Sequence, residues 1–209
     1  MSLAIVYTRA ALGIEAPLIT VEVHLSNGLP GLTMVGLPET TVKEARDRVR
    51  SALINSGYAF PAKKITINLA PADLPKEGGR YDLPIALALL VASEQLNTTR
   101  LNQYEFVGEL ALTGGLRGVP GAIPSAMEAI KAGRRIVVSS DNAAEVGLIG
   151  GSDCLVADHL QEVCAFLAGQ TSLSPPLAEA PTVDERGEDL RDVIGQQQGK
   201  RALEIVAAG

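Results

Sequence analysis

The sequence has few of the residues that build metal centres, disulfide frameworks and base-stacking surfaces. It contains no Trp, and aromatic residues make up 3% of its 209 positions. The two cysteines, Cys154 and Cys164, form no C-x-x-C pair, and the two histidines, His24 and His159, lack acidic neighbours at ligand spacing. We therefore expect neither a metal site nor a disulfide framework. Stacking platforms for single-stranded nucleic acid are scarce.

The sequence also lacks long apolar runs and the marks of secretion. No stretch reaches the length of a membrane-spanning helix, and the start, MSLAIVYTRA, has neither a basic leader nor a small-residue cleavage site. We expect no membrane association and a cytoplasmic location. A hydrophobic share of 46% can bury a sizeable core, so one main domain with a smaller appendage is expected.

Charge is unevenly distributed along the chain. The net charge of −6 argues against a generally basic nucleic-acid-binding protein. Residues 38–80 nevertheless hold eight Lys or Arg against five Asp or Glu, so this stretch carries a balance of +3. A local basic surface is therefore compatible with the acidic total.

The first half of the chain reads as strands followed by an amphipathic helix. Residues 3–8, 17–25 and 32–36 have strand patterns, and we expect them to form an antiparallel meander. A helix is predicted from Thr40 or Thr41 to Ser56. Its cations Lys43, Arg46 and Arg50 share one face. That face is either simply solvated, a contact with a phosphate backbone, or a contact between subunits of a ring.

The stretch from Lys64 to Leu90 organises the rest. It begins as an alternating strand, is interrupted by Pro71 and Pro75, and continues as a helix that is apolar nearly all round. Asp82 is predicted to cap that helix. Further strands are expected at 104–112, 134–138 and 155–156, and helices at 123–131, 142–148 and 159–168. The fold class is therefore α/β, in the α+β sense, with helices packed on a mixed sheet.

Several segments of the chain resemble a known family. The stretch PADLPKEGGRYDLPIA at 71–86 is similar to the signature of magnesium-chelatase-related AAA+ proteins of the ComM/YifB type. FVGELALTGGLR at 106–117 resembles a strand–turn–strand shared by these proteins, Lon proteases and RadA. The resemblance implies a Lon-protease-like domain of the ribosomal protein S5 domain 2-like fold over residues 1–168.

The same resemblance implies that the domain has lost the chemistry of Lon. Lon carries a nucleophilic serine in this loop and a lysine early in a later helix. Aligned on Lon, the serine position falls on Arg80 and the lysine position falls on Ile123. Since a serine nucleophile needs both an oxygen and a base, the resemblance implies a protease fold without proteolysis.

The last part of the chain changes in composition. Residues 169–188 are rich in Pro and lack an apolar period, which predicts a linker. Residues 189–209 resemble the beginning of the AAA+ module, where Val193, Ile194, Gly195 and Gln196 would lie beside the adenine of a nucleotide. No Walker A pattern occurs in the 209 residues. The resemblance therefore implies that ATP and Mg²⁺ bind to the full-length protein and not to this chain alone.

Members of this family are similar to hexameric helicases that promote branch migration during natural transformation. The resemblance implies a homo-hexameric DNA helicase and ATPase in which this domain is a ring scaffold and a DNA-facing collar. The partner would be single-stranded or branched DNA. Candidate phosphate contacts are Lys43, Arg46, Arg50, Lys76 and Arg80. The alternatives are a scaffold that assembles the ring without touching DNA, and a motor for metal insertion like that of magnesium chelatase.

Overall fold

The computed structural model describes residues 2–36, 42, 44–149, 153–176 and 189–208. The chain divides into two compact units, Met1–Glu179 and Ala180–Gly209. Residues 177–188, which hold most of the predicted linker, lie outside the described residues. The division into residues 1–168, 169–188 and 189–209 therefore stays a prediction.

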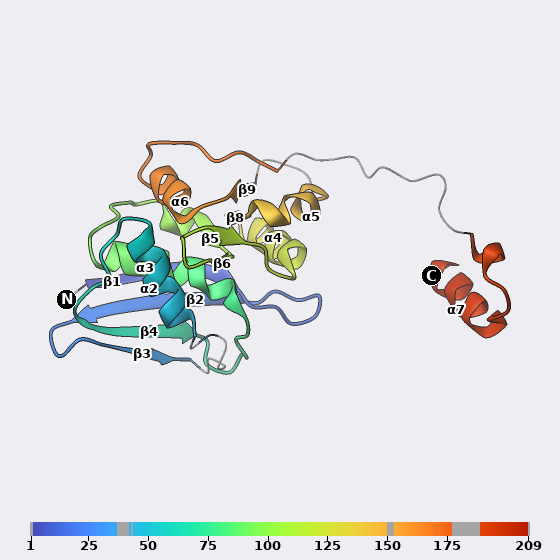
Figure 1. Cartoon of the computed structure of the whole chain (residues 1–209), viewed down its shortest axis with the longest axis horizontal. Coiled ribbons are helices and arrows are strands. Elements are labelled where there is room, and N and C mark those ends of the chain that lie inside the picture. The colour runs from blue at the N-terminus through green and yellow to red at the C-terminus, as the bar shows by residue number, and fades with distance from the viewer. Residues whose placement is uncertain (1, 37–41, 43, 150–152, 177–188, 209) are drawn as a thin grey trace. The chain divides into compact units, whose positions relative to one another are not determined.

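The first unit is built on a seven-stranded mixed sheet with strand order β3-β4-β2-β1-β5-β8-β9 (Figure 1). The strands are β1 (Ser2–Arg9), β2 (Leu18–Ser26), β3 (Gly31–Val35), β4 (Lys64–Ala70), β5 (Tyr104–Phe106), β8 (Arg135–Ser139) and β9 (Cys154–Ala157). A separate two-stranded ribbon pairs β6 (Glu109–Leu110) with β7 (Leu116–Arg117). The predicted α/β class, with helices on a mixed sheet, is confirmed.

The predicted antiparallel meander is wrong at its third strand. β1 and β2 pair antiparallel, but β4 lies between β2 and β3, and β3 runs parallel to β4. Parallel neighbours need a crossover connection, and the helix α2 (Ala45–Asn55) lies on the crossover between β3 and β4. The alternating pattern of a strand specifies its buried face but not its neighbour, so the sequence could not reveal this order.

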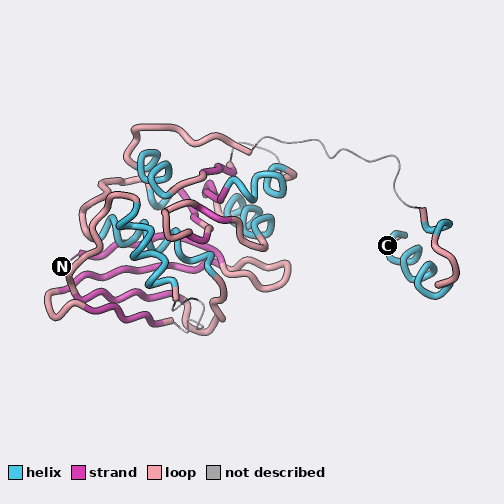
Figure 2. Tube along the Cα trace, viewed as in Figure 1, coloured by secondary structure: helices cyan, strands magenta, loops and turns pink. Residues whose placement is uncertain are grey.

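Helices cover the sheet from both faces (Figures 1 and 2). α2, α3 (Asp82–Ala92) and α6 (Leu160–Leu167) belong to the main core, which contains Val137 of β8. α4 (Ala122–Lys131) and α5 (Ala143–Gly147) join a second core with Ile136 and Val138. Because side chains alternate along a strand, the two cores lie on opposite faces of β8.

A buried carboxylate joins β1, β5 and the loop after α4. Glu105 is fully buried and accepts from Arg9 Nε at 2.5 Å and from Arg9 Nη2 at 2.7 Å. It also accepts from Arg134 Nη1 at 3.1 Å. Arg9 further donates to the carbonyl oxygens of Ala16 and Glu128. These contacts compensate the removal of the charges from water.

A second buried carboxylate corrects the prediction for Asp82. The N-cap position of α3 is Tyr81, and Asp82 is the first residue of the helix. Its carboxylate accepts from Arg48 Nε at 2.7 Å, from Arg48 Nη2 at 3.1 Å and from the Leu110 N–H at 3.3 Å. Asp82 therefore ties α3 to α2 and to β6. Burial raises the pKa of Asp82 to about 6, against the opposing effect of Arg48.

Near the end of the first unit the chain returns to the edge of the sheet. The Val156 N–H of β9 donates to the Ser174 carbonyl oxygen at 3.0 Å, and Leu173 packs against the main core. Of the helices described, none is long and apolar enough to cross a membrane. No group of three or more potential metal ligands occurs among the described residues.

We predict that Glu105→Gln destabilises the fold by about 3 kcal/mol, because it leaves two arginines facing a neutral partner in a buried site. Urea unfolding monitored by circular dichroism gives the free energy of unfolding. The matched control is Glu128→Gln, which breaks an exposed pair with Lys131 and should change the midpoint little. A loss for Glu105→Gln no larger than that of the control would contradict the role of Glu105.

We predict that the stability advantage of the wild type over Asp82→Asn shrinks as the pH rises. The folded pKa of Asp82, about 6, lies above its usual value of 3.8, so the folded state binds this proton more tightly than the unfolded state. The resulting stabilisation is complete below pH 3.8 and is lost as the pH passes through 6. The expected change is at most about 3 kcal/mol between pH 3.5 and pH 7.

Urea unfolding of both proteins across this pH range measures the difference. Asp47→Asn, at an exposed carboxylate of α2, is the control and should show no such trend. An advantage of the wild type that grows with pH would mean that the ion pair with Arg48 outweighs burial.

Candidate functional site

The loop between β4 and α3 turns its lysine inward. Lys76 is fully buried, and its Nζ donates to the carbonyl oxygens of Pro71 and Leu74, the latter at 2.8 Å. Burial lowers the pKa of Lys76. The side chain closes the loop on itself, so the predicted phosphate contact at Lys76 does not fit this placement.

Arg80 is also turned inward. It is 4% exposed, and its guanidinium donates to the Arg9 carbonyl oxygen at 3.4 Å and to the Pro120 carbonyl oxygen. Burial lowers the pKa of Arg80. The side chain links the end of β1 to the turn before α4. It is therefore not available to a phosphate backbone, and this prediction too is corrected.

A hollow of about 300 Å³ lies over Arg80, at the place where the resemblance puts a protease site. Its lining residues include no hydroxyl, thiol, lysine or imidazole side chain; they are Ala11, Pro75, Glu77, Gly78, Gly79, Arg80, Glu109, Gly118, Val119 and Pro120. Ile123, the other aligned position, lies half-buried in α4 and is not among them. These residues offer no nucleophile with an adjacent base.

Glu109 fills part of this hollow. Its carboxylate lies 3.5 Å from Arg117 Nη1 and packs directly against the backbone of Gly79. A Cβ at position 79 would come within 2.3 Å of Glu109 Oε2, so any larger residue there would require the Glu109 side chain to move. The carboxylate thus occupies space that a side chain of the loop would otherwise take.

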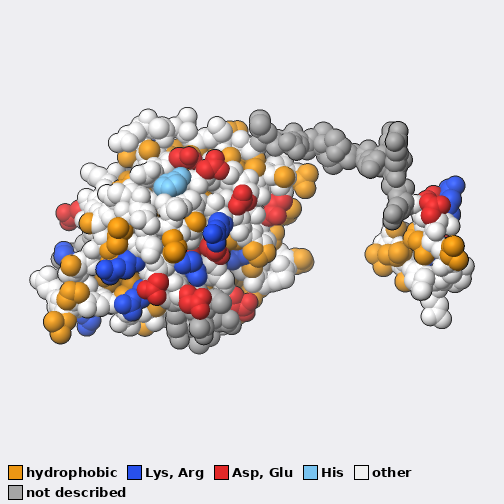
Figure 3. All heavy atoms as spheres, viewed as in Figure 1, with side chains coloured by type: hydrophobic (Ala, Val, Ile, Leu, Met, Phe, Trp, Pro, Cys, Tyr) orange, Lys and Arg blue, Asp and Glu red, His pale blue; other side chains and the backbone are white. Residues whose placement is uncertain are grey.

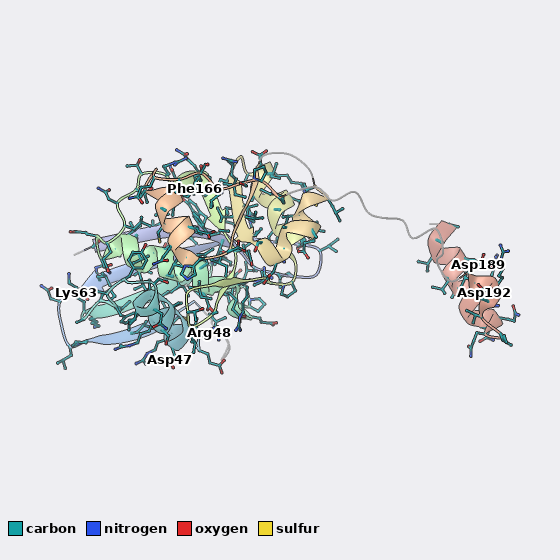
Figure 4. All side chains as sticks on the ribbon, turned by 45° about the horizontal axis from the view of Figure 1, so that its top comes forward. Asp47, Arg48, Lys63, Phe166, Asp189 and Asp192 are labelled. Carbon is teal, nitrogen blue, oxygen red and sulfur yellow. The ribbon has the colours of Figure 1, made fainter. Side chains whose placement is uncertain are left out.

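The outward cations lie on α2 and on the loop before β4. Arg46 and Arg50 are four residues apart on α2, which places them on one face of the helix. Val49 between them is buried. Lys63 is exposed on the connection that leads into β4 (Figure 4). Figure 3 shows Lys and Arg side chains gathered over this part of the surface, with Asp and Glu side chains among them.

The three cations surround a polar hollow of about 230 Å³, which we call the basic hollow. Its lining residues are Pro30, Gly31, Leu32, Arg46, Arg50, Phe60, Pro61, Ala62, Lys63 and Ile65. None of them is acidic. The Arg50 guanidinium lies over the Phe60 ring, 5.1 Å from its centroid. Arg46 has only a loose contact of 3.9 Å with the exposed Asp47.

The structure therefore divides the five predicted phosphate contacts. Arg46 and Arg50 converge on the basic hollow, Lys76 and Arg80 are buried elsewhere, and Lys43 lies outside the described residues. Sequence reasoning missed Lys63 and Phe60 as members of the site. The signal was the run FPAKK at 60–64, where an aromatic residue precedes two lysines.

The second unit contains the predicted adenine-side residues. A short 3₁₀ turn, Leu190–Asp192, is closed by Asp189, whose carboxylate accepts from the Arg191 N–H at 2.9 Å, and α7 spans Gln197–Ala208. Figure 4 labels Asp189 and Asp192 at this turn. Val193, Ile194, Gly195 and Gln196 connect the turn to α7 and are exposed. Their nucleotide contact stays a prediction.

Known proteins match this chain along its whole length. It is 75% identical over 209 residues to the YifB protein of Salmonella typhimurium and 73% identical to that of Escherichia coli. It is 56% identical over 214 aligned positions to the competence protein ComM of Haemophilus influenzae. The alignments cover all of this chain but only 41–42% of these relatives, so the chain spans about two fifths of their length.

A protein family also matches the chain. The family described as subunit ChlI of Mg-chelatase matches residues 21–142. This range includes most of β2, all of β4, α2 and α3, all lining residues of the basic hollow and all but Ala11 of those of the hollow over Arg80. The chain therefore belongs to the magnesium-chelatase-related ChlI family and, by its relatives, to the ComM/YifB type within it.

Proposed function

We propose that the first unit is the DNA-facing collar and ring scaffold of an AAA+ ATPase that acts as a helicase in branch migration during natural transformation. ATP and Mg²⁺ would bind to the full-length protein, with Val193, Ile194, Gly195 and Gln196 on the adenine side. The full-length protein would act as a homo-hexamer. The competence protein ComM among the relatives supports DNA as the partner.

The observation that carries the proposal is the convergence of Arg46, Arg50 and Lys63 on one hollow, where none of the described lining residues is acidic. Arg46 and Arg50 come from a helix and Lys63 comes from a separate loop, so the fold gathers charges that the sequence leaves apart. A cluster of exposed cations around a concave surface is the arrangement that phosphate groups require. The rest of the chain is acidic overall, which favours this surface for a DNA contact.

The scaffold without DNA contact remains the second candidate. Its supporting observation is β3, which forms one edge of the sheet directly beside the basic hollow. An edge strand can pair with another chain. In that case Arg46 and Arg50 would face a neighbouring subunit. The third alternative, metal insertion, rests on the family description alone and no geometry favours it.

We predict that Arg46→Ala combined with Arg50→Ala weakens DNA binding and flattens its salt dependence. Each phosphate contact contributes about 0.7 to 0.9 to the slope of log affinity against log salt. Loss of two contacts should therefore lower the slope by about 1.5. Fluorescence anisotropy with a labelled oligonucleotide, between 50 and 300 mM salt, measures it.

The control removes two cations elsewhere, by Arg117→Ala combined with Lys131→Ala, both of which are exposed. The net charge changes by the same amount in both double variants. If the control lowers the slope as much as the α2 variant, the basic hollow is not the DNA-contacting surface. If the wild type binds no DNA at any salt concentration, the collar role is wrong and the scaffold is favoured.

A further inference from the structure

The basic hollow contains more than a phosphate-binding surface requires. Besides its three cations it includes Phe60, one of only three phenylalanines in the chain. The ring is half-buried and packs against the main core, so its position is fixed, and the Arg50 guanidinium lies over it. Aromatic rings and guanidinium planes are the surfaces on which unpaired bases stack.

The loop that carries Phe60 is held in place before any ligand arrives. The Gln95 side chain bonds the backbone of Ala59 twice, accepting from its N–H at 2.8 Å and donating to its carbonyl oxygen at 2.8 Å. On the other wall, the Gly31 N–H donates to the Lys63 carbonyl oxygen at 3.3 Å. A preorganised pocket loses less entropy when a ligand binds.

The size and charge of the hollow select the kind of ligand. Its volume of about 230 Å³ is below the roughly 300–1,000 Å³ of pockets for drug-sized molecules, so it has room for one base and not for several stacked bases. A larger hollow beside β9 and α6 has Asp158 and Glu162 in its lining, whereas the basic hollow has cations alone. Among the described residues, neither Arg50 nor Lys63 has a carboxylate within salt-bridge distance.

We propose that the basic hollow is a subsite for one unstacked nucleotide of a single strand. Arg46 and Lys63 bind the phosphate of this nucleotide, Arg50 contacts the neighbouring phosphate through the edge of its guanidinium, and the base stacks on the face of the Arg50–Phe60 pair. This inference rests on the proposed DNA contact and specifies it. A duplex keeps its bases stacked inside, so it can use the cations of the hollow but not the aromatic surface.

Phe60→Leu tests the subsite because it keeps an apolar side chain of similar size and removes the aromatic ring. Anisotropy is measured with a single-stranded dT oligomer and with a duplex of the same length. We expect the variant to bind the single strand about 5- to 50-fold more weakly, as expected for the loss of one stacked base. Affinity for the duplex should stay within about twofold, since the cations that contact phosphates are unchanged.

The matched control is Phe166→Leu. Phe166 on α6 also lies under an arginine, Arg100, at 4.9 Å, but it is buried in the core away from the hollow (Figure 4). Phe166→Leu should leave both affinities unchanged. Phe60→Tyr keeps a stacking ring, so this variant should bind the single strand about as tightly as the wild type does. A strand with abasic positions should bind the wild type more weakly and should no longer distinguish wild type from Phe60→Leu.

The outcomes separate this inference from the proposed function. The nucleotide subsite is wrong if Phe60→Leu weakens binding to the single strand and to the duplex equally, or weakens binding to neither. The DNA contact still stands in that case, provided that Arg46→Ala combined with Arg50→Ala flattens the salt slope. If the wild type binds neither DNA, the proposed function fails and the subsite with it. Selective loss on the single strand alone supports the subsite.

Discussion

The burial of one carboxylate, Glu105, is the constraint on which the two halves of the sheet depend. β1 and β5 meet in parallel with only one registered pair, Tyr7 with Glu105. At this weakly paired junction Glu105 binds Arg9 of β1 and Arg134, the residue immediately before β8. A buried ion pair adds little net stability compared with an apolar contact, but breaking it is costly. Its presence fixes how the mixed half, β3-β4-β2-β1, abuts the parallel half, β5-β8-β9.

α2 separates its charges by direction. Arg48 turns toward Asp82 and holds α3, while Arg46 and Arg50 turn toward the basic hollow. The inward pair fixes the position of the helix, and the helix in turn fixes the spacing of the outward cations. The loop from Ala59 to Lys63 supplies the opposite wall. The candidate site therefore depends on the same contacts that build the core, and it needs no ligand to bring its residues together.

The sequence predicted the elements of this fold better than their partners. The alternation of Ile19, Val21, Val23 and Leu25 and the apolar helix after Asp82 specify burial, and burial patterns are local. The insertion of β4 between β2 and β3 depends on contacts between distant residues, which no local pattern encodes. For the same reason Lys76 and Arg80 looked like surface cations. Only the folded structure shows carbonyl oxygens placed to receive them, and only folding brings Phe60 beside Arg50.

The inward Arg80 also limits what a single substitution in the hollow above it can achieve. A serine at position 80 would leave the Arg9 and Pro120 carbonyl oxygens without their donor, inside a space that the guanidinium now fills. Glu109, packed on Gly79, would still occupy the neighbouring volume. Arg80→Ser would therefore introduce a nucleophile and destabilise the protein, and that nucleophile would still lack a base. A hydrolytic site in this hollow would therefore need at least two substitutions, one for the nucleophile and one for its base, and the first of them removes a structural support.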